Sequence, residues 1–184
     1  MKPLMWKTTA VLAAAAIVLI LFYRRTGSGL LLSLAITAGT VLYHFAMRLV
    51  VGGIFNRYMK NRADYTKPWY QPKSWETSLY RFLRVKKWKN RMPTYDPQLF
   101  DPKIHTWEEI IQAMCQAELV HETIAVLSFM PILAGIRFGA YIVFIITSVL
   151  SALLDLSFAV MQRYNRPRVL PIMERNIRAG CKCR

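Results

Sequence analysis

The sequence is poor in cysteine and in acidic residues. Its three cysteines cannot build a disulfide framework, and their odd number argues against an oxidised scaffold. Only 10 Asp and Glu stand against 25 Lys and Arg, which gives a formal net charge of +15. In a soluble protein this excess would indicate a nucleic-acid partner. Because 54% of the residues are hydrophobic and lie in long runs with the charges between them, we instead expect anionic lipid as the partner and no nucleic acid.

Several catalytic signatures are also missing. The nucleophile-elbow pattern G-x-S-x-G does not occur, so the sequence does not indicate an acyl-serine intermediate. The zinc pattern H-E-x-x-H is broken, because Ala125 stands where the second His would follow His121-Glu122. The pair Cys181 and Cys183 cannot supply four zinc ligands. The sequence therefore predicts no metal site and no cofactor.

Four long apolar runs predict an all-α membrane protein. The hydrocarbon core of a bilayer is about 30 Å thick and needs roughly 20 apolar residues of helix to cross it. We place the four transmembrane helices at residues 8–23, 29–54, 115–136 and 138–161 of a single domain, 1–184. We interpret the first run as a retained helix and not as a cleaved signal, because Arg24 and Arg25 follow it directly without a small-x-small cleavage site.

The basic residues are distributed unequally about these spans. The leading residues, the middle segment 56–114 and the tail 162–184 together carry 21 Lys and Arg, whereas the two opposite turns carry three. Lys and Arg concentrate on the cytoplasmic side of membrane proteins. We therefore expect a multi-pass protein of the cell membrane with both termini, the middle segment and the basic tail in the cytoplasm.

The middle segment alternates aromatic with basic residues. Aromatic rings favour the headgroup layer and Lys and Arg reach to lipid phosphates, so the mixture predicts an interfacial helical segment. Prolines divide the segment into short helices, of which we expect one over residues 74–91. Residues 101–109 resemble a helix start, in which Thr106 and Glu109 have the spacing of a capping box. Simple membrane adhesion is the alternative interpretation of the basic and aromatic residues.

Ionisable residues inside a span are costly and indicate function. Glu118, His121 and Glu122 have i, i+3 and i+4 spacing and share one helical face. In such an arrangement a carboxylate can orient the imidazole of His121, which we then expect to act as a general base near neutral pH. An interfacial capping cluster is the alternative. Asp155 is the single ionisable residue of the fourth span, and we expect it to form a buried pair with His44 or Arg48.

A second cluster, Gln162-Arg163-Tyr164-Asn165-Arg166-Pro167-Arg168, directly follows the fourth span. Its three guanidinium groups and two amides suit a phosphate or a carboxylate. We expect Pro167 to end the helix and to fix the turn. The alternative is an ordinary basic flank of a transmembrane helix.

Three blocks in this order carry a family resemblance: Val85-Lys86-Lys87-Trp88-Lys89, Ala117-Glu118-Leu119-Val120-His121 and Gln162–Arg168. They resemble the glycosyl-4,4'-diaponeurosporenoate acyltransferase family, small membrane enzymes of carotenoid biosynthesis that acylate a carotenoid glucoside. The resemblance implies transfer of a fatty acyl group to a sugar hydroxyl of a membrane glycolipid, with His121 and Glu118 as the catalytic pair. It also implies a site for the donor or the sugar, formed by Lys86, Lys87, Trp88, Lys89, Gln162, Arg163, Tyr164, Asn165, Arg166 and Arg168.

The expected donor is a thioester, either acyl-CoA or an acyl carrier protein, and direct transfer aided by His121 is the simplest mechanism. Two other functions remain open on the sequence. One is a small helical membrane methyltransferase or reductase, in which the Arg-rich motif binds a nucleotide cofactor. The other is a non-catalytic membrane subunit whose basic segment holds anionic lipid.

Overall fold

The computed structural model describes residues 2–178 of the chain, and in this part every regular element is helical. Four helical stretches are long and apolar enough to cross a membrane: Lys2–Thr26, Gly29–Met59, Trp107–Phe138 and Tyr141–Arg178. The prediction of an all-α membrane protein with four candidate spans is therefore confirmed. The observed helices extend beyond the predicted spans at most of their ends.

The chain forms two compact units. The first comprises the residues up to Gly53 together with Thr123–Leu154, and the second comprises Ile54–Glu122 together with the residues from Asp155 onward. The division falls inside three long helices, α2 (Gly29–Met59), α5 (Trp107–Leu127) and α7 (Tyr141–Arg178).

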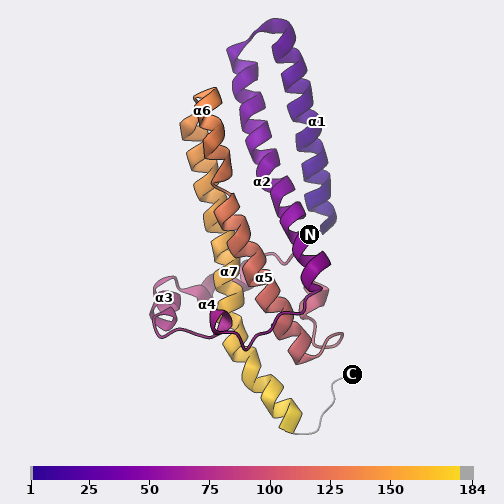
Figure 1. Cartoon of the computed structure of the whole chain (residues 1–184), viewed down its shortest axis with the longest axis vertical. Helices are drawn as coiled ribbons and strands as arrows, with labels where there is room; N and C mark the ends of the chain where they lie inside the picture. The colour runs from indigo at the N-terminus through magenta and orange to yellow at the C-terminus, as the bar shows by residue number, and fades with distance from the viewer. Residues whose placement is uncertain (1, 179–184) are drawn as a thin grey trace. The chain divides into compact units, whose positions relative to one another are not determined.

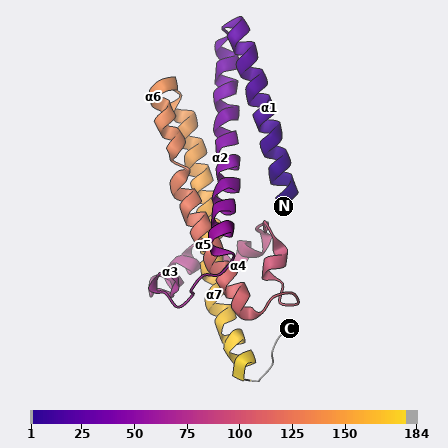
Figure 2. The ribbon, with the colours of Figure 1, turned by 45° about the vertical axis from the view of Figure 1, so that its right-hand side comes forward.

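The first unit begins with a helical hairpin. Helix α1 (Lys2–Thr26) and α2 lie side by side, as both views show (Figures 1 and 2). Gly27 between them has a φ of +66°, a left-handed conformation that glycine adopts without steric cost. After α5, a 3₁₀ turn η4 (Met130–Ala134) and α6 (Gly135–Phe138) lead to α7. Pro131 at the start of η4 lacks an amide N–H, which explains why the predicted span 115–136 is not one continuous α-helix.

Polar side chains also link helices within the first unit. The Arg48 guanidinium donates to the hydroxyl of Ser151 at 2.8 Å, and this hydroxyl lies 2.9 Å from the hydroxyl of Ser128. The phenol of Tyr43 donates to the carbonyl oxygen of Leu127 at 2.9 Å. These bonds join α2 to α5 and to α7 in an otherwise apolar part of the chain.

The second unit contains short elements between α2 and α5. They are η1 (Pro68–Tyr70), α3 (Glu76–Phe82), α4 (Val85–Trp88), η2 (Lys89–Arg91) and η3 (Pro97–Phe100). The predicted capping box precedes α5: the Thr106 amide donates to the carboxylate of Glu109 at 2.9 Å, and the Glu109 amide donates to the Thr106 hydroxyl at 3.3 Å. The capping-box prediction is confirmed.

The single helix predicted over residues 74–91 is wrong. The structure has α3 and α4 there, separated by Arg84 in a left-handed conformation with a φ of +50°. The indole N–H of Trp88 donates to the carbonyl oxygen of Leu83 at 2.9 Å and bridges this turn. Neither glycine nor proline marks the break, so its position could not be seen in the sequence.

The prediction that Pro167 ends the fourth helix is also wrong. Helix α7 continues through Pro167 and Pro171 to Arg178, so most of the predicted tail 162–184 is helical. A proline in a helix leaves the carbonyl one turn earlier without its amide donor. For Pro167 this is the carbonyl oxygen of Arg163, and the Arg168 side chain donates to the next carbonyl oxygen along the helix, that of Tyr164. The end of the tail, with Cys181 and Cys183, lies outside the described residues.

Candidate active site

The candidate site lies in the second unit, where α5 and α7 pack against each other in opposite directions. Glu118 and His121 are one turn apart on α5. Glu118 contacts Arg163 and Arg166 of α7, whereas His121 contacts Asp155, which is more than two turns earlier in α7. The antiparallel register therefore places an imidazole–carboxylate pair and an ionic cluster next to each other along the same two helices.

His121 and Asp155 form the imidazole–carboxylate pair. The Nδ1 atom of His121 lies 2.9 Å from Oδ1 of Asp155. Asp155 is almost fully buried, with 1% of its side chain exposed, whereas 24% of the His121 side chain is exposed. The imidazole stacks on the ring of Phe158, with 4.8 Å between centroids and 16° between planes. Asp155 and Phe158 thus hold the imidazole on two sides, while part of it stays accessible.

This pairing corrects the predicted role of Glu118. Both carboxylate oxygens of Glu118 are bound by arginines: Arg163 Nη1 donates to Oε1 at 2.5 Å, and Arg166 donates to Oε2. Glu118 is also fully buried. Two guanidinium groups satisfy this carboxylate more completely than one imidazole on its own helix would. Asp155 therefore occupies the place beside His121 in which we expected Glu118.

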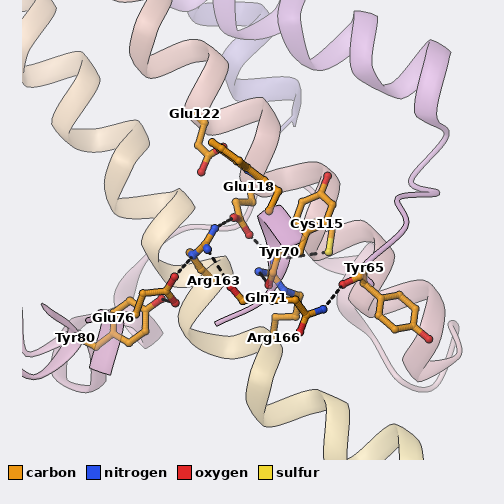
Figure 3. Close-up of polar contacts among 11 residues, drawn as sticks. Tyr65, Tyr70, Gln71, Glu76, Tyr80, Cys115, Glu118, Glu122, Arg163 and Arg166 are labelled. Atoms are coloured by element: carbon orange, nitrogen blue, oxygen red, sulfur yellow. Dashed lines mark hydrogen bonds and ion pairs between the residues drawn. The ribbon is translucent and has the colours of Figure 1, made fainter. Parts of the chain in front are cut away.

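A second buried carboxylate extends the ionic cluster. Arg163 lies between two acids, since its Nε donates to Glu76 at 2.6 Å while its Nη1 donates to Glu118 (Figure 3). The phenol of Tyr80 donates to the other oxygen of Glu76 at 2.8 Å. Burial, and then the hydrogen bond to Glu76, raise the pKa of the Tyr80 phenol. These contacts fix α3 to α7 across more than 80 residues of sequence.

Arg166 closes the cluster on the other side. Its guanidinium is 2% exposed, donates to the carbonyl oxygen of Tyr70 and lies 5.2 Å from the centre of that tyrosine ring. The thiol of Cys115 lies 3.7 Å from the same guanidinium. Burial is the main cause that raises the pKa of Tyr70 to about 12. Figure 3 shows how Arg163 and Arg166 extend from α7 toward Glu118.

The two arginines are therefore used differently from our expectation. We expected Arg163 and Arg166 in a site for the donor or the sugar, whereas in the structure they neutralise Glu76 and Glu118 inside the second unit. A buried carboxylate needs such partners, because an unpaired charge away from water is costly. The prediction rested on the cations of this block and did not include Glu76 and Glu118, the acids that neutralise them.

The other predicted donor-site residues are buried, contact one another or line a cavity. Gln162 is buried in α7. Tyr164 is buried and lies close to two cations, because the Lys89 ammonium and the Arg168 guanidinium are 5.3 Å and 3.5 Å from the ring centre. Lys89 also donates to the Asn165 side chain at 2.7 Å.

Lys86, Lys87 and Arg168 line an open cavity of about 620 Å³, together with Tyr164. Trp88 is not among the residues that line this cavity, and its indole instead supports the turn before α4. The three basic residues are therefore the part of the predicted donor site that the structure brings together on an accessible surface.

Sequence reasoning missed Glu76 and the contact between Asp155 and His121. Glu76 has no helical neighbour that would suggest its partner, since Arg163 follows it by 87 residues. Asp155 could be recognised as unusual, because it is the single ionisable residue in an apolar run. Its spacing to His121, 34 residues, carries no local signal. Within residues 2–178 the structure shows no group of three or more His, Cys, Asp or Glu that could hold a metal ion.

Comparison with known proteins identifies the family. The model of the glycosyl-4,4'-diaponeurosporenoate acyltransferase family matches residues 66–175, which include the imidazole–carboxylate pair, the ionic cluster and the cavity. No curated protein and no solved structure matches the chain. The match covers more than half of the chain and confirms the resemblance. The chain belongs to this acyltransferase family.

Proposed function

We propose that this member of the family transfers a fatty acyl group from a thioester donor to a sugar hydroxyl of a membrane glycolipid, a carotenoid glucoside or a related molecule, with His121 as the general base. One observation carries the mechanism: Nδ1 of His121 lies 2.9 Å from the buried carboxylate of Asp155 while the ring is partly exposed. A neutral imidazole that donates from Nδ1 to a carboxylate carries its lone pair on Nε2. That nitrogen is then available to accept a proton.

The proposed reaction proceeds by direct attack. Nε2 of His121 removes the proton from the sugar hydroxyl as the oxygen forms a bond to the thioester carbonyl carbon. The C–S bond of the resulting tetrahedral intermediate then breaks, and the departing sulfur takes the proton from the imidazolium. Asp155 holds the ring in place and stabilises its positive charge. General base catalysis of this kind contributes about 10²–10⁴ in rate.

The environment of Cys115 favours direct transfer over a covalent intermediate. An acyl-enzyme would need an accessible nucleophile. Cys115 is fully buried and lies against Arg166. We therefore propose no acyl intermediate on Cys115, and we expect sequential kinetics in which donor and acceptor are bound at the same time.

The proposal includes the side of the membrane. The four apolar helices indicate a membrane protein. We propose the cell membrane, with both termini and the short helices of the second unit on the cytoplasmic side, because 21 Lys and Arg lie in the segments assigned to that side against three in the opposite turns. An acyl thioester made in the cytoplasm would then reach the enzyme without crossing the bilayer.

The experiment compares two histidine variants in phosphatidylcholine nanodiscs. The full chain receives acyl-CoA and a glycosylated carotenoid acid, and mass spectrometry measures the acylated product. We expect His121→Ala to reduce kcat by about 10²–10⁴. His105→Ala is the matched control, because His105 lies in the loop before α5 and forms an exposed pair with Glu109. Turnover of His121→Ala at the level of the control would reject the role of His121.

Asp155 is tested as a positioning residue. We expect Asp155→Asn to lower kcat by about a hundredfold, within the range of general base catalysis, with the donor KM unchanged, because the amide no longer stabilises the imidazolium. Asp155→Glu should restore part of kcat, since it keeps the charge. Loss of donor binding in Asp155→Asn, or no rescue by Asp155→Glu in a folded sample, would instead indicate a purely structural role.

A further inference from the structure

The cavity in the second unit carries a concentration of positive charge. It lies between α3, the turn at Arg84, α4 and the C-terminal part of α7, and its volume of about 620 Å³ is in the range of small-molecule sites. The residues that line it include six cations: Lys73, Arg81, Arg84, Lys86, Lys87 and Arg168. All belong to the second unit, so the cavity is formed within one compact body.

The positive charge of the cavity is not neutralised from within the described residues. Glu76 is the one acid in its lining, and this carboxylate is buried and already bound by Arg163 and Tyr80. In residues 2–178 none of the six cations takes part in an ion pair with an acid. Cations held together in this way repel one another, and an anionic ligand would relieve the repulsion.

Near Tyr164, which lines the cavity, two further contacts involve cations and no acid. The Lys89 ammonium lies 5.3 Å and the Arg168 guanidinium 3.5 Å from the centre of the Tyr164 ring. Burial lowers the pKa of Lys89, and the charge of Arg168 lowers it further. Two cations therefore share one aromatic ring beside the cavity without an intervening carboxylate.

The backbone at Arg84 joins the two basic elements at the cavity. A left-handed conformation is unfavourable for a residue other than glycine, and such strain is common at binding sites. At Arg84 it turns the chain sharply between Arg81 of α3 and Lys86 and Lys87 of α4, and all four residues line the cavity. In a continuous helix through residues 81–87, Lys86 would stand two residues from Arg84 and would face another side of the helix.

We propose that this cavity binds the phosphate-bearing nucleotide end of a diffusible acyl thioester, which makes acyl-CoA the donor. The proposal rests on the thioester chemistry of the proposed function. Coenzyme A carries a diphosphate and a 3'-phosphate, and this clustered negative charge matches several cations at once. The cavity also has apolar surfaces at Pro72, Pro167 and Tyr80, which suit a nucleoside and are not needed by a bare phosphate.

The test measures binding of adenosine 3',5'-bisphosphate, the nucleotide fragment of coenzyme A, to the full chain in phosphatidylcholine nanodiscs. Calorimetry compares the wild type with Lys86→Gln/Lys87→Gln. We expect the double variant to weaken binding by about tenfold or more, because each charge-assisted contact to a phosphate contributes strongly. Lys67→Gln/Lys103→Gln removes two exposed lysines that do not line the cavity and should bind like the wild type.

Three outcomes would overturn the proposal. The first is equal weakening in the two double variants, which would indicate unspecific attraction. The second is full displacement of the nucleotide by inorganic phosphate at the same concentration, which would assign the cavity to free phosphate. The third is loss of binding when the nanodiscs contain phosphatidylglycerol, which would assign the cavity to a lipid headgroup. An acyl carrier protein as the donor would appear as transfer without any binding of the bisphosphate.

The variant His121→Ala separates this proposal from the mechanism. We expect it to bind the bisphosphate as tightly as the wild type while its transfer is lost. An active His121→Ala would reject the catalytic assignment and leave the nucleotide site standing. Unchanged binding in Lys86→Gln/Lys87→Gln would reject the nucleotide site and leave the role of His121 standing. A single size-exclusion peak for each variant shows that the compared samples are folded.

Discussion

The two units of the chain satisfy their polar side chains in different ways. In the first unit, several hydroxyl groups donate to the carbonyl oxygen four residues earlier in their own helix, as Thr9, Thr37 and Thr147 do, and the bonds between helices that we described involve neutral acceptors. In the second unit, charged groups from segments far apart in sequence bind one another, as Arg163 binds both Glu76 and Glu118. A hydroxyl that bonds to its own helix needs no neighbour, whereas a buried charge depends on a particular partner.

The residues with a left-handed backbone conformation also differ between the two units. In the first unit these positions are glycines, Gly27 and Gly139, and in the second they are Lys60, Asn61 and Arg84. Glycine makes a turn at little steric cost, while a residue with a side chain must be held in place by its surroundings. Many hydroxyl bonds and both left-handed turns of the first unit are therefore local, although Arg48, Ser128 and Ser151 also link its helices. The second unit is stabilised by contacts between distant segments, and it contains the candidate site.

Removal of a central charge in the second unit should change the free energy of unfolding more than any other substitution considered below. Glu118→Gln leaves Arg163 and Arg166 with fewer partners in a buried place, and we expect a loss of about 3–5 kcal/mol in the free energy of unfolding. Glu174→Gln is the matched control, because its pair with Arg178 spans 3.9 Å between exposed side chains. This control should cost less than about 1 kcal/mol.

Equilibrium unfolding in mixed detergent micelles measures both variants. A cost for Glu118→Gln no greater than that for Glu174→Gln would show that the ionic cluster does not stabilise the second unit. The second unit would then not depend on its distant charge pairs for stability.

The sequence was sufficient to predict what depends on local pattern. The four apolar runs and the capping box of Thr106 and Glu109 were recognisable because helix length, hydropathy and capping are local properties. His121 was recognisable as a candidate because an ionisable residue is rare in a span. Family membership followed from three short blocks and is confirmed by the match over residues 66–175.

The partners of the charged residues could not be predicted in the same way. A helical spacing suggested Glu118 as the neighbour of His121, but the packing of α5 on α7 decided in favour of Asp155. The continuation of α7 through Pro167 and the helix break at Arg84 were likewise not marked by any signal in the sequence that we recognised. The charges of the candidate site pair over separations of 34 to 87 residues, and no helical periodicity predicts such pairs.

A smaller effect tests the left-handed positions of the two units. Arg84→Gly removes an unfavourable conformation, and we expect it to stabilise the chain by up to about 1 kcal/mol. Arg84→Ala controls for the lost side chain, because it keeps the unfavourable φ. Gly27→Ala introduces the same penalty in the first unit and should destabilise by about 1 kcal/mol, since no atom lies near enough to clash with the new Cβ. Destabilisation by Arg84→Gly, beyond that of Arg84→Ala, would contradict this account.

The smallest effect concerns matched threonine substitutions. The Thr37 hydroxyl donates to the Ser33 carbonyl oxygen at 2.9 Å in the middle of α2, where the helix already supplies that oxygen with an amide donor. We therefore expect Thr37→Val to change the free energy of unfolding by less than about 0.5 kcal/mol.

In the second unit the Thr106 hydroxyl accepts a hydrogen bond from the Glu109 amide, which has no partner within its own helix. Thr106→Val should cost about 1 kcal/mol in the same assay, because a capping contact is lost. Equal costs would mean that local hydroxyl bonds are as important in the first unit as the contacts that begin α5 are in the second.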